Sequence, residues 1–162
     1  MIYIVLGVSG SGKSTIGKAL ANHLSIDFYD ADDFHPPNNV AKMSQGIPLQ
    51  DEDRYPWLNA MRSNFELWSK SGVVLACSAL KEEYRIFLNE NTDQIVWIFL
   101  DGSFDLIAER MKNRAGHFMK VALLQSQFDA LEVPHYGIHI NIDQTPDQII
   151  DELVKKLTKR HD

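Results

Sequence analysis

Gly7-Val-Ser-Gly-Ser-Gly-Lys13-Ser14 is the most informative segment of this 162-residue chain for its fold class. It fits the pattern G-x-x-x-x-G-K-[ST] at every fixed position, and it stands between a short apolar run (residues 2–6) and an amphipathic stretch (residues 14–24). Glycines allow a backbone to wrap closely around a phosphate group, so that successive N–H groups and the start of the next helix face the anion. Between a strand and a helix, the motif predicts a nucleotide-binding phosphate loop.

Two side chains of the loop have predicted roles. Lys13 is expected to bridge the β- and γ-phosphates of a nucleoside triphosphate, and Ser14 is expected to ligate Mg²⁺. The loop alone does not distinguish a kinase from a GTPase or ATPase switch, so the rest of the chain must decide.

Short apolar runs alternate with longer amphipathic stretches along the whole chain. The runs expected to form strands are residues 2–6, 28–30, 73–77, 95–100 and 138–142. The expected helices are residues 14–24, a helix that carries Trp57, Met61, Phe65 and Trp68 and ends near Gly72, and residues 104–112, 120–131 and 146–159. This alternation predicts an α/β fold in one domain, residues 1–162, with a five-stranded parallel sheet covered by helices on both faces.

The composition narrows the class of protein. Hydrophobic residues make up 44% of the chain, which favours a globular protein. The formal net charge of −6 argues against general binding to nucleic acid or to anionic membranes. A single cysteine, Cys77, excludes an intrachain disulfide, and the N-terminal apolar run is too short for a signal peptide or a membrane span. We therefore expect a cytoplasmic enzyme.

An acidic turn, Asp30-Ala-Asp32-Asp33-Phe34-His35, follows the second expected strand. Carboxylates this close together are costly unless a cation or a donor compensates, and ligands of such sheets collect at the carboxyl ends of the strands. We expect Asp30 to hold a water on Mg²⁺ and Asp32 to reach a substrate hydroxyl. Asp33 is expected to cap the next helix, and His35 to hydrogen-bond substrate or protein rather than a metal. A solvated acidic turn is the alternative.

At this point the chain resembles the gluconate kinases (gluconokinases), which are relatives of shikimate kinase and the nucleoside monophosphate kinases. The segments that carry the resemblance are residues 7–14, 30–36, 39, 42–43, 46–49, 51–58, 77–81, 84–85 and 116–118. A shikimate kinase would be expected to show a Gly-Gly-Gly turn after the third strand, where Cys77-Ser-Ala-Leu-Lys81 stands instead.

The resemblance implies a P-loop kinase fold with a mobile lid at about residues 110–125 and an acceptor-binding region at about residues 31–71. It implies ATP and Mg²⁺ as cofactors and transfer of the γ-phosphoryl group to the 6-hydroxyl of D-gluconate. Many members are dimers, so a homodimer stays open. A kinase for another acid or a nucleoside monophosphate and a non-catalytic nucleotide-binding switch also stay open, although the catalytic groups Lys13, Ser14, Asp32 and Arg114 argue against the switch.

An acidic acceptor such as gluconate needs cations and hydrogen-bonding groups. Arg54, Lys81 and Arg85 are the candidates, and the last two would share a face of a helix that starts after the third strand. An arginine offers two parallel hydrogen bonds to a carboxylate. By resemblance to shikimate kinase, Arg54 would hold the acid and Asp32 the attacking hydroxyl. Ser78 is expected either to cap that helix or to bond substrate.

The region of the lid is expected to contribute two arginines. The resemblance places Arg110 against the adenine face and Arg114 over the transferring phosphoryl group, while Pro146 would close the other side of the adenine. A surface ion pair is the alternative for Arg110. The predicted nucleotide-binding residues are Gly7, Val8, Ser9, Gly10, Ser11, Gly12, Lys13, Ser14, Thr15, Arg110 and Pro146. The predicted catalytic residues are Lys13, Asp32 and Arg114; the substrate-binding residues are Asp32, His35, Arg54, Ser78, Lys81 and Arg85; the Mg²⁺ ligands are Ser14 and Asp30.

Overall fold

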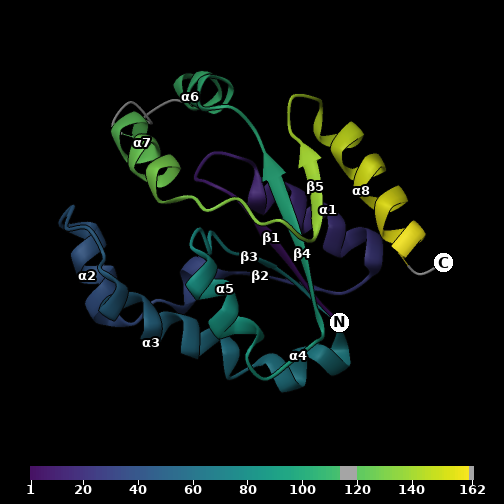
Figure 1. Ribbon diagram of the computed structural model, residues 1–162, viewed down its shortest axis with the longest axis horizontal. Coiled ribbons are helices and arrows are strands. Elements are labelled where there is room, and N and C mark those ends of the chain that lie inside the picture. The colour runs from purple at the N-terminus through teal and green to yellow at the C-terminus, as the bar shows by residue number, and fades with distance from the viewer. Residues whose placement is uncertain (114–119, 161–162) are drawn as a thin grey trace.

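A five-stranded parallel sheet forms the centre of the molecule (Figure 1). The computed structural model describes residues 1–113 and 120–160 of the chain. The strands are β1 Ile2–Leu6, β2 Asp27–Asp30, β3 Val73–Ala76, β4 Ile95–Asp101 and β5 Ile138–Asn141, and their order across the sheet is β2-β3-β1-β4-β5. The predicted parallel sheet is therefore confirmed, and each predicted strand ends within one residue of the observed one.

The apolar runs of β1, β3 and β4 follow from their central position. Ile4 of β1 pairs with Leu75 on one side and with Trp97 on the other, and all three side chains are buried. Strands that are covered on both faces need apolar residues at successive positions rather than at alternate ones. Their carboxyl ends lie at one edge of the sheet, where the phosphate loop and the acidic turn leave β1 and β2.

Helices cover both faces of the sheet, as predicted. One core lies between the sheet and helices α1, α6, α7 and α8, and a second core lies between the opposite face and α3, α4 and α5. The helices are α1 Lys13–Leu24, the short 3₁₀ helix η1 Ala31–Phe34, α2 Pro37–Ser44, α3 Asp51–Arg62, α4 Phe65–Ser71, α5 Glu82–Asn89, α6 Phe104–Lys112, α7 Lys120–Ala130 and α8 Pro146–Arg160. Among the residues described, no helix is both long and apolar enough to cross a membrane.

The expected helix through Trp57 and Trp68 is two helices, α3 and α4. Ser63 Oγ and Asn64 Nδ2 both donate to the carbonyl of Ala60, at 2.8 and 3.0 Å. Such local side-chain bonds compete with the backbone ladder of a helix. The helical spacing of the aromatic residues hid this break, because all of them face the same core.

Helix α2 was not predicted, because it lacks an apolar stripe that faces the core. Its one buried residue is Asn39, whose Nδ2 donates to the backbone carbonyl of Asp53 at 2.8 Å, whereas Val40 and Met43 are exposed. The capping role expected for Asp33 is also wrong: Asp30 caps η1, and Pro36 precedes α2. Of the predicted lid, residues 114–119 lie outside the described part of the chain, and Arg114 lies there with them.

Candidate active site

The phosphate loop turns from β1 into α1 at the carboxyl edge of the sheet. Gly10 and Gly12 have φ angles of 79° and 98°, a region of backbone conformation that glycine adopts without strain. Gly10 also packs on α6, because a Cβ added there would lie 2.9 Å from Cγ of Met111. Both glycines suit the turn of the loop, and Gly10 is also needed for the contact of the loop with α6.

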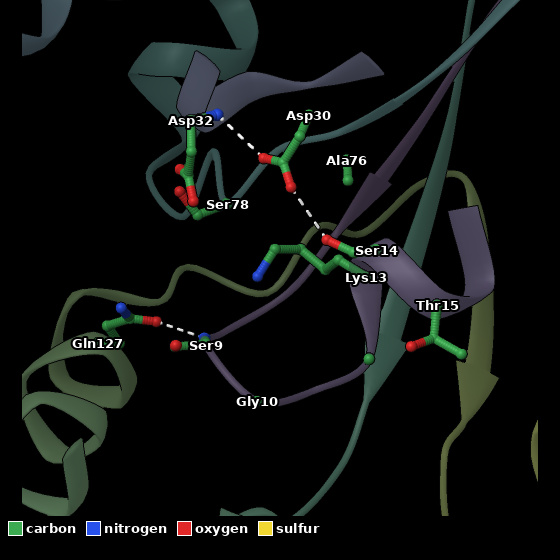
Figure 2. A pocket seen from close by; sticks show the side chains of 11 residues that line it. Ser9, Gly10, Lys13, Ser14, Thr15, Asp30, Asp32, Ala76, Ser78 and Gln127 are labelled. Carbon is green, nitrogen blue, oxygen red and sulfur yellow. Dashed lines mark hydrogen bonds between the residues drawn. The ribbon is translucent and has the colours of Figure 1, made fainter. Parts of the chain in front are cut away.

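Lys13 stands at the first position of α1 and bends back over the loop. Its Nζ donates to the carbonyl of Val8 at 3.0 Å. Burial lowers the pKa of Lys13, and the negative charge of Asp32 opposes that shift. Figure 2 shows the amino group of Lys13 pointing into the space between the loop and Asp32. A partly desolvated cation there is well placed to bind a phosphate oxygen.

Asp30 joins the acidic turn to the phosphate loop. Its Oδ2 accepts a hydrogen bond from Ser14 Oγ at 3.0 Å, and its Oδ1 accepts one from the backbone N–H of Asp32, also at 3.0 Å (Figure 2). Mg²⁺ commonly binds one or two protein oxygens and takes its other ligands from water and phosphate. The Ser14 and Asp30 oxygens fit that pattern, and the described residues contain no cluster of three or more carboxylate, His or Cys side chains that would suit a metal held by protein alone.

Asp32 directs its carboxylate into the same space. Desolvation raises the pKa of Asp32, and the charge of Asp30 raises it further, while Lys13 lowers it. A carboxylate with a raised pKa that still faces a cleft is a suitable acceptor for a hydroxyl proton. Asp30 and Asp32 thus have different surroundings: Asp30 accepts a hydrogen bond from Ser14, whereas the carboxylate of Asp32 faces the cavity.

A cavity of about 240 Å³ unites these groups at the carboxyl edge (Figure 2). Ser78 lines it and does not cap α5, whose N-cap is Lys81. Gln127 of α7 also lines it, and its Oε1 accepts a 2.5 Å hydrogen bond from the N–H of Ser9. Gln127 was missed by the sequence reasoning, since no motif links α7 to the loop. The lining residues are Ser9, Gly10, Gly12, Lys13, Ser14, Thr15, Asp30, Asp32, Ala76, Ser78 and Gln127.

A second cavity, of about 530 Å³, lies on the other side of the loop. It brings together Arg110 and Pro146, the two residues expected at the adenine. Arg110 Nη2 donates to the backbone carbonyl of Ile142 at 2.6 Å rather than to an acidic side chain on its own helix. Ser11 Oγ is buried beside this cavity and has no hydrogen-bond partner within residues 1–113 and 120–160, so a ligand could satisfy it. Gly10, Gly12 and Thr15 line both cavities.

The predicted acceptor cations lie beyond Asp32, next to Asp51. Lys81 Nζ donates to Asp51 Oδ1 at 3.1 Å, and the hydroxyl of Tyr84 donates to the same oxygen. Arg54 Nη1 lies 3.3 Å from that hydroxyl and 3.9 Å from Asp51. The bonds from Tyr84 and Lys81 lower the pKa of Asp51. One carboxylate thus orders two cations that remain about one-third exposed and open to an anionic ligand.

His35 lies near both Asp32 and Arg54, since the charges of both residues act on its ring. Its ring stacks on Trp57 with centroids 4.6 Å apart, and Trp57 Nε1 is anchored by the backbone carbonyl of Ala31 at 2.7 Å. Burial lowers the pKa of His35; the charge of Asp32 raises it, and that of Arg54 lowers it. Asn39 Nδ2 lies 3.1 Å from His35 Nδ1, and because an amide nitrogen only donates, Nδ1 is the acceptor and the proton of the neutral ring is on Nε2. An Nε2–H group can donate to a hydroxyl oxygen of a ligand but cannot bind a metal ion.

Arg85 is not brought to this cleft, which corrects its predicted role. The residue is fully buried, and its guanidinium donates to the backbone carbonyls of Ala79, Leu80 and Glu132 at 2.8, 3.1 and 2.6 Å. It also pairs with Glu82 at 2.8 Å. α5 begins at Glu82, so Lys81 precedes the helix and the two cations do not share a helical face. Arg85 therefore fixes the 77–81 segment from within the protein interior, through its bonds to the carbonyls of Ala79 and Leu80.

Comparison with known proteins identifies relatives of this chain. The sequence model of the shikimate kinase family matches residues 9–158. The chain is 50% identical to the thermosensitive gluconokinase of Escherichia coli (strain K12) over 134 residues, which cover 82% of this chain and 72% of that one. It is 42% identical to a probable gluconokinase of Dictyostelium discoideum, with 97% and 86% of the two chains covered.

A solved structure extends the likeness to the fold. The crystal structure of a gluconokinase from Sinorhizobium meliloti 1021 superimposes with a TM-score of 0.88 at 43% identity, over 97% of this chain and 91% of that one. Its high coverage means that the sheet, the phosphate loop and the helices around the cleft are shared rather than one motif alone. The chain belongs to the gluconokinase family, within the shikimate kinase-like P-loop kinases.

Proposed function

We propose that this protein transfers the γ-phosphoryl group of ATP to the 6-hydroxyl of D-gluconate, giving 6-phospho-D-gluconate and ADP. The observation that carries the proposal is the cavity in which Lys13, Ser14, Asp30 and Asp32 meet, with Arg54 and Lys81 beyond it. The names of the curated relatives, gluconokinases at about 40–50% identity, support this acceptor.

The phosphate loop binds the triphosphate in this proposal. Its backbone N–H groups face the phosphates, and Lys13 bridges the β- and γ-phosphates. Ser14 and Asp30 are the residues that would hold Mg²⁺, which when bound neutralises charge on the phosphates. Arg110 and Pro146 line the cavity proposed for the adenine, and Arg114 is proposed to contribute positive charge over the transferring group.

The acceptor is oriented by groups on the far side of Asp32. Arg54 and Lys81 bind the carboxylate of gluconate, while His35 and Ser78 hydrogen-bond its hydroxyls. This leaves the 6-hydroxyl at Asp32, which orients it and accepts its proton as the bond to phosphorus forms. Phosphoryl transfer depends mainly on positioning and on charge stabilisation, and both are supplied by groups on rigid elements here.

The test is a coupled ADP-release assay with Mg²⁺ and ATP against a panel of acceptors. We expect turnover with D-gluconate and little turnover with shikimate or AMP. Shikimate is the sharpest comparison, because the matching family model is that of shikimate kinase. Equal or faster ADP release with shikimate or AMP would refute the acceptor, and no acceptor-dependent release with any compound would favour the non-catalytic switch.

A further inference from the structure

Gln127 reaches the phosphate loop from a helix that is distant in sequence. Its Oε1 accepts a 2.5 Å hydrogen bond from the N–H of Ser9, 118 residues away, and its side chain is half-buried. The same side chain lines the cavity that contains Lys13, Asp32 and Ser78. Gln127 thus lies at the place where the phosphate loop and the acceptor side of the cleft face each other (Figure 2).

The hydrogen bond to Ser9 determines which way the amide of Gln127 is turned. A backbone N–H can only donate, so the oxygen of the amide must face Ser9 and the Nε2 amino group must face elsewhere. Figure 2 shows this nitrogen on the side away from the Ser9 bond. Because the amino group only donates, it suits an anionic oxygen and not the Lys13 ammonium that shares the cavity.

The bond also affects the loop itself. The N–H of Ser9 is engaged by a protein oxygen, whereas donors of a phosphate loop ordinarily face the phosphate. Hydrogen bonding at the oxygen of an amide polarises the group and strengthens its N–H donors. The Ser9–Gln127 pair therefore presents a polarised, uncharged donor on a side chain that lines the same cavity as Lys13.

We propose that Gln127 is a further phosphate-binding residue of this site, whose Oε1 fixes the Ser9 N–H and whose Nε2 donates to an oxygen of the terminal phosphate of the nucleoside triphosphate. The inference rests on the proposed phosphotransfer, but it does not depend on which acceptor is used. Its consequence is selective: the contact exists with a triphosphate and is lost when the terminal phosphate leaves.

A purely structural role for Gln127 predicts a different result. If the side chain only held α7 against the loop, its loss would weaken the binding of ADP and of the ATP analogue equally, because the same loop binds both nucleotides. Binding of ADP and of a non-hydrolysable ATP analogue, measured by calorimetry with Mg²⁺ and without any acceptor, separates the two roles. A failed gluconate assignment would leave this comparison intact.

Two substitutions and a matched control make the test sharp. Gln127→Ala should lower the affinity for the ATP analogue about tenfold, the effect of losing one hydrogen bond to a charged group. The affinity for ADP should change by less than about twofold. Gln127→Glu keeps an oxygen that can accept from the Ser9 N–H, but it replaces the Nε2 donor with a negatively charged oxygen. This variant should lower the affinity for the analogue at least as much as Gln127→Ala does, and it should lower kcat about 100-fold. Gln125→Glu, on the same helix but exposed and bonded to Asp129, should change neither.

The outcomes either support or overturn the proposal. The proposal is supported if the Gln127 variants lose affinity for the triphosphate analogue and not for ADP, and if Gln127→Glu loses more of that affinity than Gln125→Glu does. Equal losses for ADP and the analogue, or a Gln127→Glu enzyme that binds the analogue as the wild type does, overturn it. Thermal unfolding of each variant confirms that binding is measured on folded protein, and Gln127→Glu keeps the test available if Gln127→Ala loosens α7.

Discussion

Ser14 Oγ donates a 3.0 Å hydrogen bond to Oδ2 of Asp30, and through it the first turn of α1 is joined to the end of β2. The other oxygen of Asp30 accepts the N–H of Asp32. Both Asp30 oxygens are therefore engaged at the loop, while the Asp32 carboxylate is turned to the cleft. Two neighbouring carboxylates are held in geometries that suit different roles.

The first prediction separates these two carboxylates. Asp30→Asn should lower activity in a way that higher Mg²⁺ concentration partly restores, because its oxygens adjoin Ser14 at the proposed metal position. Asp32→Asn should lower kcat about 100-fold, the lower end of a general-base contribution, with little effect on ATP binding. Single-turnover rates across a Mg²⁺ titration measure both effects.

The comparison of the two variants carries its own control. Each substitution removes one negative charge from the same turn and keeps the size of the side chain. Rescue of Asp32→Asn by Mg²⁺, without rescue of Asp30→Asn, would reverse the proposed roles.

The pH dependence of activity is the second prediction. Desolvation and the charge of Asp30 raise the pKa of Asp32. Protonated Asp32 cannot accept the hydroxyl proton, so kcat/KM for gluconate should fall as the pH drops through this raised pKa, and the fall should begin above the range of an ordinary Asp. Wild-type rate profiles between pH 4 and pH 8 test this, and an acid limb in the ordinary Asp range would contradict the proposed environment.

A pair of arginine variants gives the third prediction. Arg54→Ala should raise the KM for gluconate roughly tenfold to a hundredfold, the loss of one charge-assisted bond, and leave stability nearly unchanged because the side chain is about one-third exposed. Arg85→Ala should instead reduce the free energy of unfolding by about 3 kcal/mol or more, since it strands the carbonyls of Ala79, Leu80 and Glu132.

Urea unfolding and steady-state kinetics on both variants check this division. For a chain of this size, a loss of about 3 kcal/mol corresponds to a melting temperature lower by roughly 6–12 °C. If the Arg85→Ala protein is as stable as the wild type and only its KM for gluconate rises, the original prediction that Arg85 binds the acceptor would be correct.

The thiol of Cys77 provides the fourth prediction. It is 1% exposed at the end of β3, and burial raises its pKa to about 12. At pH 8 about one thiol in 10⁴ would then be ionised, so the native protein should react negligibly with a thiol reagent such as DTNB. In urea one thiol per chain should react, because Cys77 is the only cysteine. Rapid labelling of the native protein would contradict the burial of this strand end.

Much of the fold could be predicted from the sequence, because central parallel strands and amphipathic helices leave different patterns. The runs of β1, β3 and β4 are apolar at nearly every position, and they were found to within a residue. The break at Ser63 and Asn64 could not be predicted because it depends on two side chains that both donate to the carbonyl of Ala60. The spacing of apolar residues contains no information about such hydrogen bonds.

The site was predictable where a motif implies its own geometry, as in the phosphate loop and the turn at Asp30. It was not predictable where the partner lies far away in sequence. Arg85 was expected to face substrate because an acidic acceptor needs cations and because Arg85 would share a helical face with Lys81. Its guanidinium instead donates to the carbonyl of Glu132, which is 47 residues away in sequence. The contact of Gln127 with Ser9 arises only when α7 packs beside the loop.

The last prediction concerns Lys13, whose ammonium group donates to the phosphate loop and whose charge acts on Asp32. Lys13→Met keeps much of the side-chain length and removes the charge, so kcat should fall about 10²- to 10³-fold, as on loss of a preorganised stabilising group. The positive charge of Lys13 lowers the pKa of Asp32, so its removal should raise that pKa and move the acid limb of the remaining activity to higher pH. The fold should survive, because within residues 1–113 and 120–160 the Lys13 side chain makes one hydrogen bond, to the carbonyl of Val8. Circular dichroism, single-turnover rates and the pH profile of the variant test the three statements separately. A variant with near-wild-type kcat would remove the phosphate loop from the mechanism, and an unmoved acid limb would show that Asp32 does not sense the charge on Lys13.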